Sequence, residues 1–183
     1  MKGIVFTEFL EMVEAQFGES VVDQVIEASN LPNGGAYTAV GTYSSSEMLR
    51  LISSLSIATQ TPAANLSRAF GQYLFKRFSQ VYPSMFAGTT HALAFLKTID
   101  QHIHVQVRKL YPDAELPSFS FHEPQPGQLV MIYESHRPLA DLAEGLIQGC
   151  IAYFGETITL ERNNLQSGEL NRERFVLTHV AVR

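Results

Sequence analysis

Two histidines, His102 and His104, stand two positions apart within a run whose apolar spacing is typical of a helix. On a regular helix this spacing turns the two side chains about 200° apart, so they cannot both bind one metal ion. At most one imidazole therefore faces a buried cofactor. Periodicity places His102 near the face of Phe95 and His104 near that of Leu96 and Val107, and it does not choose between them. A lone helix histidine is also often a hydrogen-bonded structural residue.

A second group of polar residues, Tyr133, Ser135 and Arg137, follows an apolar run that begins at Gln128. In an extended chain alternate side chains point to the same side. Two hydroxyls and a guanidinium spread over about 13 Å could then bind a ligand that carries two carboxylates. Taken alone, the pattern is more often that of a polar strand end before a helix.

Common signatures of catalysis are missing from the sequence, which has no glycine-rich phosphate loop, no paired zinc-type cysteines and no Gly-x-Ser-x-Gly nucleophile. An enzyme that used His102, His104 or Ser135 would lack a nucleophile–base–oxyanion pattern. We therefore expect no enzymatic activity. Cys150 has no partner for an internal disulfide, and we expect it to be a small buried apolar residue rather than a redox switch.

The composition bounds the class of protein. With 183 residues, 45% hydrophobic and 17% charged, the chain is expected to form one globular domain over residues 1–183 and not to be a membrane protein. A net charge of −5 argues against nucleic acid as a partner, because phosphate binding needs clustered Lys and Arg. Glu8 and Glu11 interrupt the opening segment where a signal peptide would be apolar, so we expect a cytoplasmic protein.

The elements that must position these residues are helices first and strands later. Apolar periodicity, caps and breakers predict helices over 4–17, from 20 to about 30, from the capping pattern Ser44–Glu47 onward, from Thr61 as N-cap, and over 90–110. A strand over 128–133, a helix over 138–154 and strands near 157–162 and 173–182 follow. The order predicts an α+β fold: an N-terminal helical subdomain, then a mixed helix and antiparallel-sheet subdomain.

Both polar groups lie in segments that resemble those of one known protein family. The segment around His104, from Ile103 to Tyr111, resembles the proximal-histidine segment of bacterial H-NOX (haem nitric oxide/oxygen binding) proteins, and Tyr133-x-Ser135-x-Arg137 matches their propionate-binding motif. The resemblance covers essentially the whole chain. Residues 1–5, 69–75 and 143–146 are also similar to family sequence.

The resemblance implies a haem b cofactor (iron protoporphyrin IX), with His104 as the axial iron ligand and His102 as an incidental neighbour. Tyr133, Ser135 and Arg137 are then expected to bind the propionates. Pro117 matches a proline that packs against the porphyrin in this family, although an ordinary turn would also explain it. The further haem-contacting residues expected from the resemblance are Phe9, Leu74, Phe78, Leu142 and Leu146.

The resemblance also indicates which gas the haem is expected to bind. Oxygen-binding relatives carry a distal tyrosine that corresponds to Leu142, with supporting positions at Phe9 and Leu74. None of the three side chains present here can donate a hydrogen bond, which favours nitric oxide over oxygen, with carbon monoxide as a second candidate ligand. In most folds these residues would simply be core, and a haem pocket is itself core.

The expected function is a nitric oxide sensor in which the gas binds ferrous haem opposite His104, weakens the iron–histidine bond and alters the regulation of a partner. The resemblance suggests a histidine kinase or a cyclic-di-GMP enzyme acting in trans. Ala140, Arg162 and Leu165 stand where some relatives carry a zinc or thiol-switch site, so that site is not expected here. The alternative is a carrier or sensor of another apolar small molecule that needs no haem.

Overall fold

The computed structural model describes residues 1–165 and 168–180, and its elements follow the predicted order of helices and then strands. Among these residues the helices α1 to α4 come first, followed by a short 3₁₀ turn, two short helices flanking a π-helical segment, and then four strands with one helix between the second and third. The bounds are α1 Gly3–Phe17, α2 Glu19–Ser29, α3 Ser45–Thr59, α4 Ala63–Val81, 3₁₀ Pro83–Met85, α5 Ala92–Lys97, π Ile99–Ile103, α6 His104–Leu110, β1 Ser118–His122, β2 Gln128–Ser135, α7 Ala140–Phe154, β3 Ile158–Asn164 and β4 Asn171–His179.

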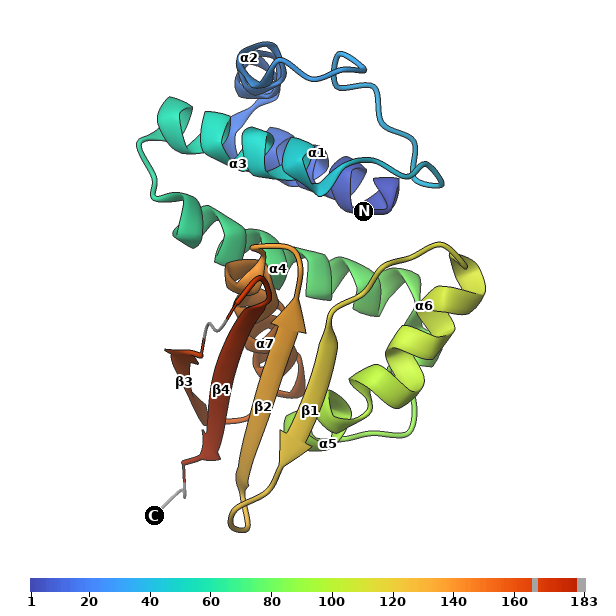
Figure 1. Cartoon of the computed structure of the whole chain (residues 1–183), viewed down its shortest axis with the longest axis vertical. Coiled ribbons are helices and arrows are strands. Elements are labelled where there is room, and N and C mark those ends of the chain that lie inside the picture. The colour runs from blue at the N-terminus through green and yellow to red at the C-terminus, as the bar shows by residue number, and fades with distance from the viewer. Residues whose placement is uncertain (166–167, 181–183) are drawn as a thin grey trace.

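Three layers make up the molecule (Figure 1). Helices α1, α2 and α3 lie together at one end, α4 runs beneath them, and the sheet stands at the other end with α7 behind it. The four strands pair antiparallel in the order β1-β2-β4-β3. This arrangement confirms the predicted α+β class, because the helical layer and the antiparallel sheet are segregated along the chain.

Local sequence accounts for the start of α3 but not for that of α4. The capping box that begins α3 is present, since Ser44 accepts from the first turn and Glu47 reaches back to the Ser44 backbone. The predicted N-cap Thr61 of α4 is wrong. Pro62 takes that position without a side-chain cap, and the Thr61 hydroxyl donates to the Thr59 carbonyl instead.

The single helix predicted over 90–110 is also wrong, because the segment divides into α5, the π-helical segment and α6. The Thr98 hydroxyl donates to the Phe95 carbonyl at the end of α5. The Thr98 carbonyl then accepts from the amides of both His102 and Ile103, and the second of these is a π-type bond. A side chain that bonds its own helix backbone competes with the regular ladder, so Thr98 marks the place where the helix changes.

The sheet has one strand more than the sequence analysis predicted. The additional strand is β1, which precedes the predicted strand over 128–133. The alternation of Phe119 and Phe121 with polar residues is the sequence pattern that could have predicted β1. Strand β2 ends at Ser135, and β3 and β4 differ by one or two residues from the predicted bounds where these are described. The predicted end of the last strand, at 181–182, lies outside the described residues.

Helices α4 and α7 cross at close range between the helical layer and the sheet. A Cβ atom added to Gly145 would lie 2.1 Å from the Arg68 carbonyl oxygen, and one added to Gly71 would lie 2.4 Å from that of Leu142. Only glycine allows the two backbones to approach this closely. Two clusters of buried side chains meet here, one under α1–α4 and one between α7 and the sheet.

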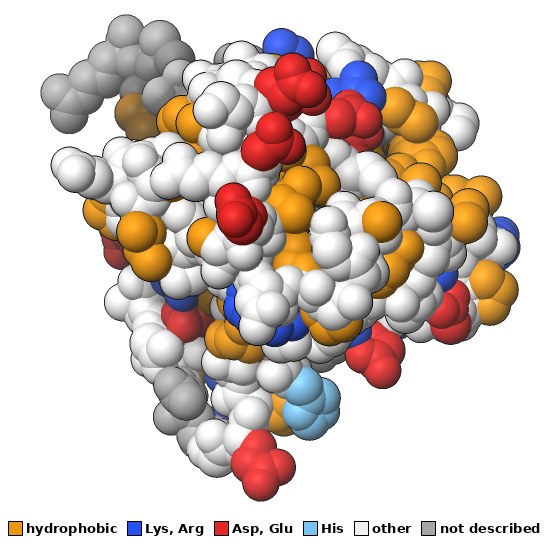
Figure 2. All heavy atoms as spheres, turned by 90° about the horizontal axis from the view of Figure 1, so that it is seen from above, with side chains coloured by type: hydrophobic (Ala, Val, Ile, Leu, Met, Phe, Trp, Pro, Cys, Tyr) orange, Lys and Arg blue, Asp and Glu red, His pale blue; other side chains and the backbone are white. Residues whose placement is uncertain are grey.

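The surface carries no large basic area on the face seen from the helical end (Figure 2). Acidic side chains lie there beside hydrophobic ones, and Lys and Arg appear singly or in small groups. Within the described ranges, no helix combines the length and apolar character needed to cross a bilayer.

Candidate functional site

A cavity of about 590 Å³ lies where the helical layer, α6 and the sheet meet. Its volume falls within the usual range for small-molecule and cofactor sites. The wall is formed by residues at the N-terminus, the segment 42–45, the C-terminal half of α4 and the N-terminal half of α7. The segment from α5 to α6, the loop 111–117 and the C-terminal end of β2 complete it. The lining is mostly apolar, and its polar groups are gathered on two sides.

His104 occupies one wall as the first residue of α6, and its side chain is buried. Its Nδ1 lies 2.7 Å from the Asp100 carboxylate, one turn earlier. Because a carboxylate only accepts, Nδ1 carries the proton in the neutral ring and Nε2 keeps its lone pair. Among the described residues Nε2 has no hydrogen-bond partner, so this lone pair is available toward the cavity that His104 lines.

Burial sets the charge state of this imidazole. Loss of solvent lowers the pKa of His104, and the adjacent Asp100 opposes that shift without reversing it. The neutral ring is therefore favoured near neutral pH, which is the form that binds transition metals. His102, two positions earlier, is exposed and does not line the cavity, so the structure separates the two histidines that periodicity could not.

No protein metal centre of three or more ligands exists in the part of the chain that the structure describes. A metal ion in the cavity would have one imidazole ligand from the wall. It must then bring its other ligands with it, as the iron of a macrocycle does.

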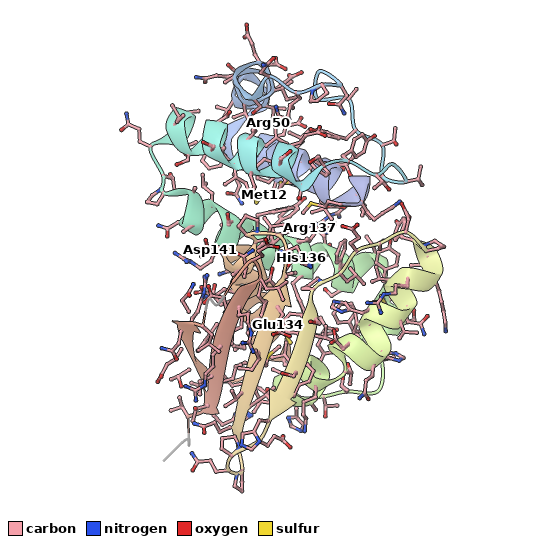
Figure 3. The ribbon with its side chains drawn as sticks, viewed as in Figure 1. Met12, Arg50, Glu134, His136, Arg137 and Asp141 are labelled. Atoms are coloured by element: carbon pink, nitrogen blue, oxygen red, sulfur yellow. The ribbon has the colours of Figure 1, made fainter. Side chains whose placement is uncertain are left out.

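The second polar side of the cavity is the rim formed by Tyr133, Ser135 and Arg137, all of which line it. Strand β2 ends at Ser135, whose hydroxyl accepts from the Arg137 amide at 3.0 Å, and the Tyr133 hydroxyl donates to the Arg137 carbonyl at 3.5 Å. The expected extended run to Arg137 is therefore wrong in detail, because a serine turn bends the chain after β2. Figure 3 shows Arg137 and the neighbouring His136 at this end of β2, below the helical layer.

Further charged groups converge on the same rim. The Arg137 guanidinium donates to the carbonyl and the carboxylate of Glu115 in the loop 111–117. Burial and the nearby Arg137 charge lower the pKa of the Met1 amino group, which donates to the Tyr43 carbonyl. Lys2 and Asp113, both also on the cavity wall, form an ion pair at 3.1 Å. The rim thus carries two cationic side chains, Arg137 and Lys2, each paired with a carboxylate from the loop 111–117.

Helices α1, α4 and α7 are apolar where they line the cavity, whereas the segment 42–45 lines it with hydroxyl side chains. Helices α1, α4 and α7 contribute Ile4, Val5, Leu74, Phe75, Phe78, Leu142, Ala143, Leu146 and Ile147 to the cavity, and none of these side chains can donate a hydrogen bond. Tyr82, which directly follows α4, also lines the cavity. Burial and a hydrogen bond with Tyr111 raise the pKa of Tyr82 to about 12, so this hydroxyl stays protonated and is already partnered.

Of the ten site residues expected from the resemblance, nine come together around the cavity: His104, Tyr133, Ser135, Arg137, Pro117, Leu74, Phe78, Leu142 and Leu146. Phe9 does not line it. Its ring is fully buried in the helical core and packs edge-on against Phe70 at 5.1 Å. The sequence analysis missed Asp100 and Phe119, and the only signal for Asp100 was its position four residues before a histidine on one helix face.

Comparison with known proteins identifies the family. The model of the haem-NO-binding family matches residues 2–162. The chain belongs to the H-NOX family. Among curated protein sequences, none is significantly similar to it.

Solved structures of other H-NOX proteins have the same fold. The Fe(II) unliganded H-NOX protein from K. algicida is 36% identical, with a TM-score of 0.92 over 100% of this chain and 98% of that one. An H-NOX protein from S. oneidensis in the Fe(II)NO state is 25% identical, with a TM-score of 0.90 over 99% and 100%. The Shewanella woodyi H-NOX in the Fe(II)CO state is 36% identical, with a TM-score of 0.83 over 98% and 95%.

One H-NOX position noted from the sequence has a separate structural role here. Arg162 on β3 forms ion pairs with Asp141 at 2.7 Å and Glu144 at 2.9 Å on α7, and with Glu173 at 3.1 Å on β4. These contacts tie the edge strand β3 to α7. The guanidinium thus occupies, with three carboxylates, the region where some relatives were expected to carry metal-binding side chains.

Proposed function

We propose that residues 1–183 form one H-NOX domain that binds haem b through His104 and senses nitric oxide. The observation that carries the proposal is the buried imidazole whose Nδ1 is held by Asp100 and whose Nε2 is left for a metal in an apolar cavity. When bound, the haem supplies a ferrous iron with one coordination position open to a diatomic gas.

The rim residues fit the two propionates of such a cofactor. Ser135 accepts from the Arg137 amide and keeps its own hydroxyl proton for a further acceptor. Arg137 offers a planar fork of donors, which suits carboxylates, and its present partner Glu115 is itself an exposed carboxylate that a propionate can replace. We infer that Tyr133 supports this site indirectly, by holding the Arg137 carbonyl and thus the turn.

Nitric oxide is the proposed ligand because the walls formed by α1, α4 and α7 offer no donor. Bound oxygen draws negative charge from iron and is stabilised by a hydrogen bond, whereas nitric oxide needs little such help. A missing charge-assisted bond of about 1.5–3 kcal/mol lowers the oxygen affinity roughly ten- to a hundredfold. Carbon monoxide, which draws less negative charge from iron than oxygen does, is a second proposed ligand of the same site.

The output follows from the position of His104. It is the first residue of α6, so any movement of the ring is passed to α6 and to the π-helical segment before it. We propose that this movement changes the affinity for a partner signalling protein in the cytoplasm, a histidine kinase or a cyclic-di-GMP enzyme in trans. The domain is proposed to have no catalytic activity of its own.

The test is an absorption spectrum of the purified protein under reducing conditions. We expect a ferrous haem Soret band that shifts on addition of nitric oxide and of carbon monoxide, and no stable oxygen complex in air. A colourless protein that carries another apolar molecule would favour the alternative of a non-haem carrier. A persistent oxygen complex would refute the nitric oxide assignment while leaving haem binding intact.

A substitution sharpens the gas assignment. Leu142→Tyr places a hydroxyl on the apolar wall and is expected to lengthen the lifetime of an oxygen complex, by about tenfold or more if the hydrogen bond forms. Leu142→Phe is the matched control, because it adds similar bulk without a donor. Equal oxygen lifetimes in the two variants would show that the missing donor is not the cause.

A further inference from the structure

Asp100, which lies inside the π-helical segment, makes contacts with two separate parts of the site. One carboxylate oxygen lies 2.7 Å from His104 Nδ1, and the other accepts from the Phe119 backbone amide at 2.8 Å. Its side chain is 28% exposed and that of His104 is 10% exposed, so both contacts are largely shielded from water. The same carboxylate thus joins the imidazole to strand β1.

The Phe119 amide needs this partner because β1 is an edge strand. Among the described strands its only neighbour is β2, where Phe119 lies opposite Tyr133. The amide that bonds Asp100 points away from β2, on the unpaired side of the strand, and an unpaired buried amide is costly. Asp100 therefore satisfies the Phe119 amide at the sheet edge as well as Nδ1 of the histidine.

Aromatic contacts extend the same connection to the rim. The Phe119 ring lies 6.0 Å from the His104 ring and 5.6 Å from that of Tyr133, measured between centroids. Tyr133 in turn donates to the Arg137 carbonyl. A continuous chain of contacts thus runs from Asp100 through β1 to the residues at the rim of the cavity.

We propose that Asp100 is a positioning residue with two roles: it fixes the tautomer of His104 that leaves Nε2 unprotonated, and it couples the position of this imidazole to strand β1. The inference rests on the proposed function of His104. A shift of the ring along α6 then pulls on the Phe119 amide, so the sheet edge as well as the helix responds to the state of the site. A carboxylate partner also makes the imidazole a stronger donor to a metal.

The first experiment uses the full chain without haem, labelled with ¹⁵N. Ring-nitrogen shifts of His104 report the tautomer, and hydrogen exchange reports the protection of the Phe119 amide. We expect the Nδ1-protonated tautomer in the unsubstituted protein. Asp100→Ala is expected to lower its share and to speed exchange at Phe119 by about tenfold or more, the loss of one charge-assisted hydrogen bond.

Asp100→Asn and Glu123→Gln complete the series. Asparagine keeps the volume of the side chain and can bond one of the two partners through its single oxygen, so we expect an intermediate exchange rate at Phe119. Because it keeps this volume, Asp100→Asn is expected to fold and replaces Asp100→Ala if that variant is unstable. Glu123→Gln removes an exposed carboxylate that pairs with Lys97, and is expected to change neither readout. An unchanged tautomer and unchanged Phe119 exchange in both Asp100 variants would overturn the proposal.

Haem loading separates this inference from the proposed function. The haem-free measurements report Asp100 whether or not the protein binds haem, and failure to load would count against the function alone. In loaded protein, we expect the iron–histidine stretching band to move to lower frequency in Asp100→Asn, because a neutral partner leaves the imidazole a weaker donor. A merely structural role for Asp100 would leave that band in place.

Discussion

The two sides of the cavity are built on different principles. On the α6 side, a single imidazole is held by a carboxylate, the helix is interrupted by a π-helical segment, and an edge strand is tied in through a backbone amide. On the side of α1, α4 and α7, every lining side chain is apolar and the helices cross at glycines. Directional contacts determine the first side, and shape and close packing determine the second.

The two sides therefore control different properties: one the orientation of a metal ligand, the other the exclusion of hydrogen-bond donors and water. Directional hydrogen bonds fix where a metal ligand points, and they can be broken or made as discrete events. An apolar wall offers no such event and acts by excluding donors and water. We therefore expect substitutions on the α6 side to change cofactor binding sharply, and substitutions on the opposite side to change ligand preference or stability by smaller amounts.

The largest expected effect comes from the α6 side. His104→Ala removes the proposed metal ligand of the cavity wall, and we expect the purified protein to carry no haem, as measured by the ratio of Soret to protein absorbance. Free imidazole added during growth should restore the band, because it can enter the space left by the side chain. His102→Ala is the matched control and should retain haem fully, since His102 is exposed. Equal loss in the two variants would contradict the assignment.

The next effect is at the rim. Arg137→Ala removes the planar donor fork and is expected to speed haem transfer to an apoprotein acceptor by roughly ten- to a hundredfold, the loss of a charge-assisted contact of about 1.5–3 kcal/mol. Lys109→Ala removes an equal charge from an exposed position on α6 and serves as the control. Similar transfer rates in both variants would show that haem retention depends on overall charge and not on the Arg137 donor fork.

Sequence periodicity predicted the apolar faces of the helices, whereas the place of these faces at a cavity was expected only from the family resemblance. The helical spacing of Leu142 and Leu146, and of Leu74 and Phe78, predicted apolar faces that do line the cavity. Such faces depend only on which residues recur every three or four positions. Phe9 shows the limit, since it belongs to the same kind of face but packs against Phe70, and only the tertiary arrangement decides which core a face joins.

The α6 side depends on contacts between distant residues, which no local pattern reports. The choice between His102 and His104 required the family resemblance, because a regular helix was assumed where the chain forms a π-helical segment. The start of α5 is similarly set by Glu156, whose carboxylate accepts from the Ala92 amide 64 residues away. The partner of Asp100 on β1 is a backbone amide, which almost every residue has, so no residue type in the sequence could indicate this contact.

The smallest expected effect tests the apolar side at its closest packing. Gly145→Ala replaces a glycine in the interior of α7, and helix propensity alone predicts stabilisation by about 1 kcal/mol. The added Cβ would meet the Arg68 carbonyl oxygen at 2.1 Å, which forces α4 and α7 apart. We therefore expect the opposite sign, a loss of about 1–3 kcal/mol in the free energy of unfolding, measured with denaturant on haem-free protein. Ala152→Gly, at an exposed position of the same helix, calibrates propensity without a crossing. If Gly145→Ala stabilised the protein by the amount that Ala152→Gly costs, close packing at this crossing would not determine the apolar wall.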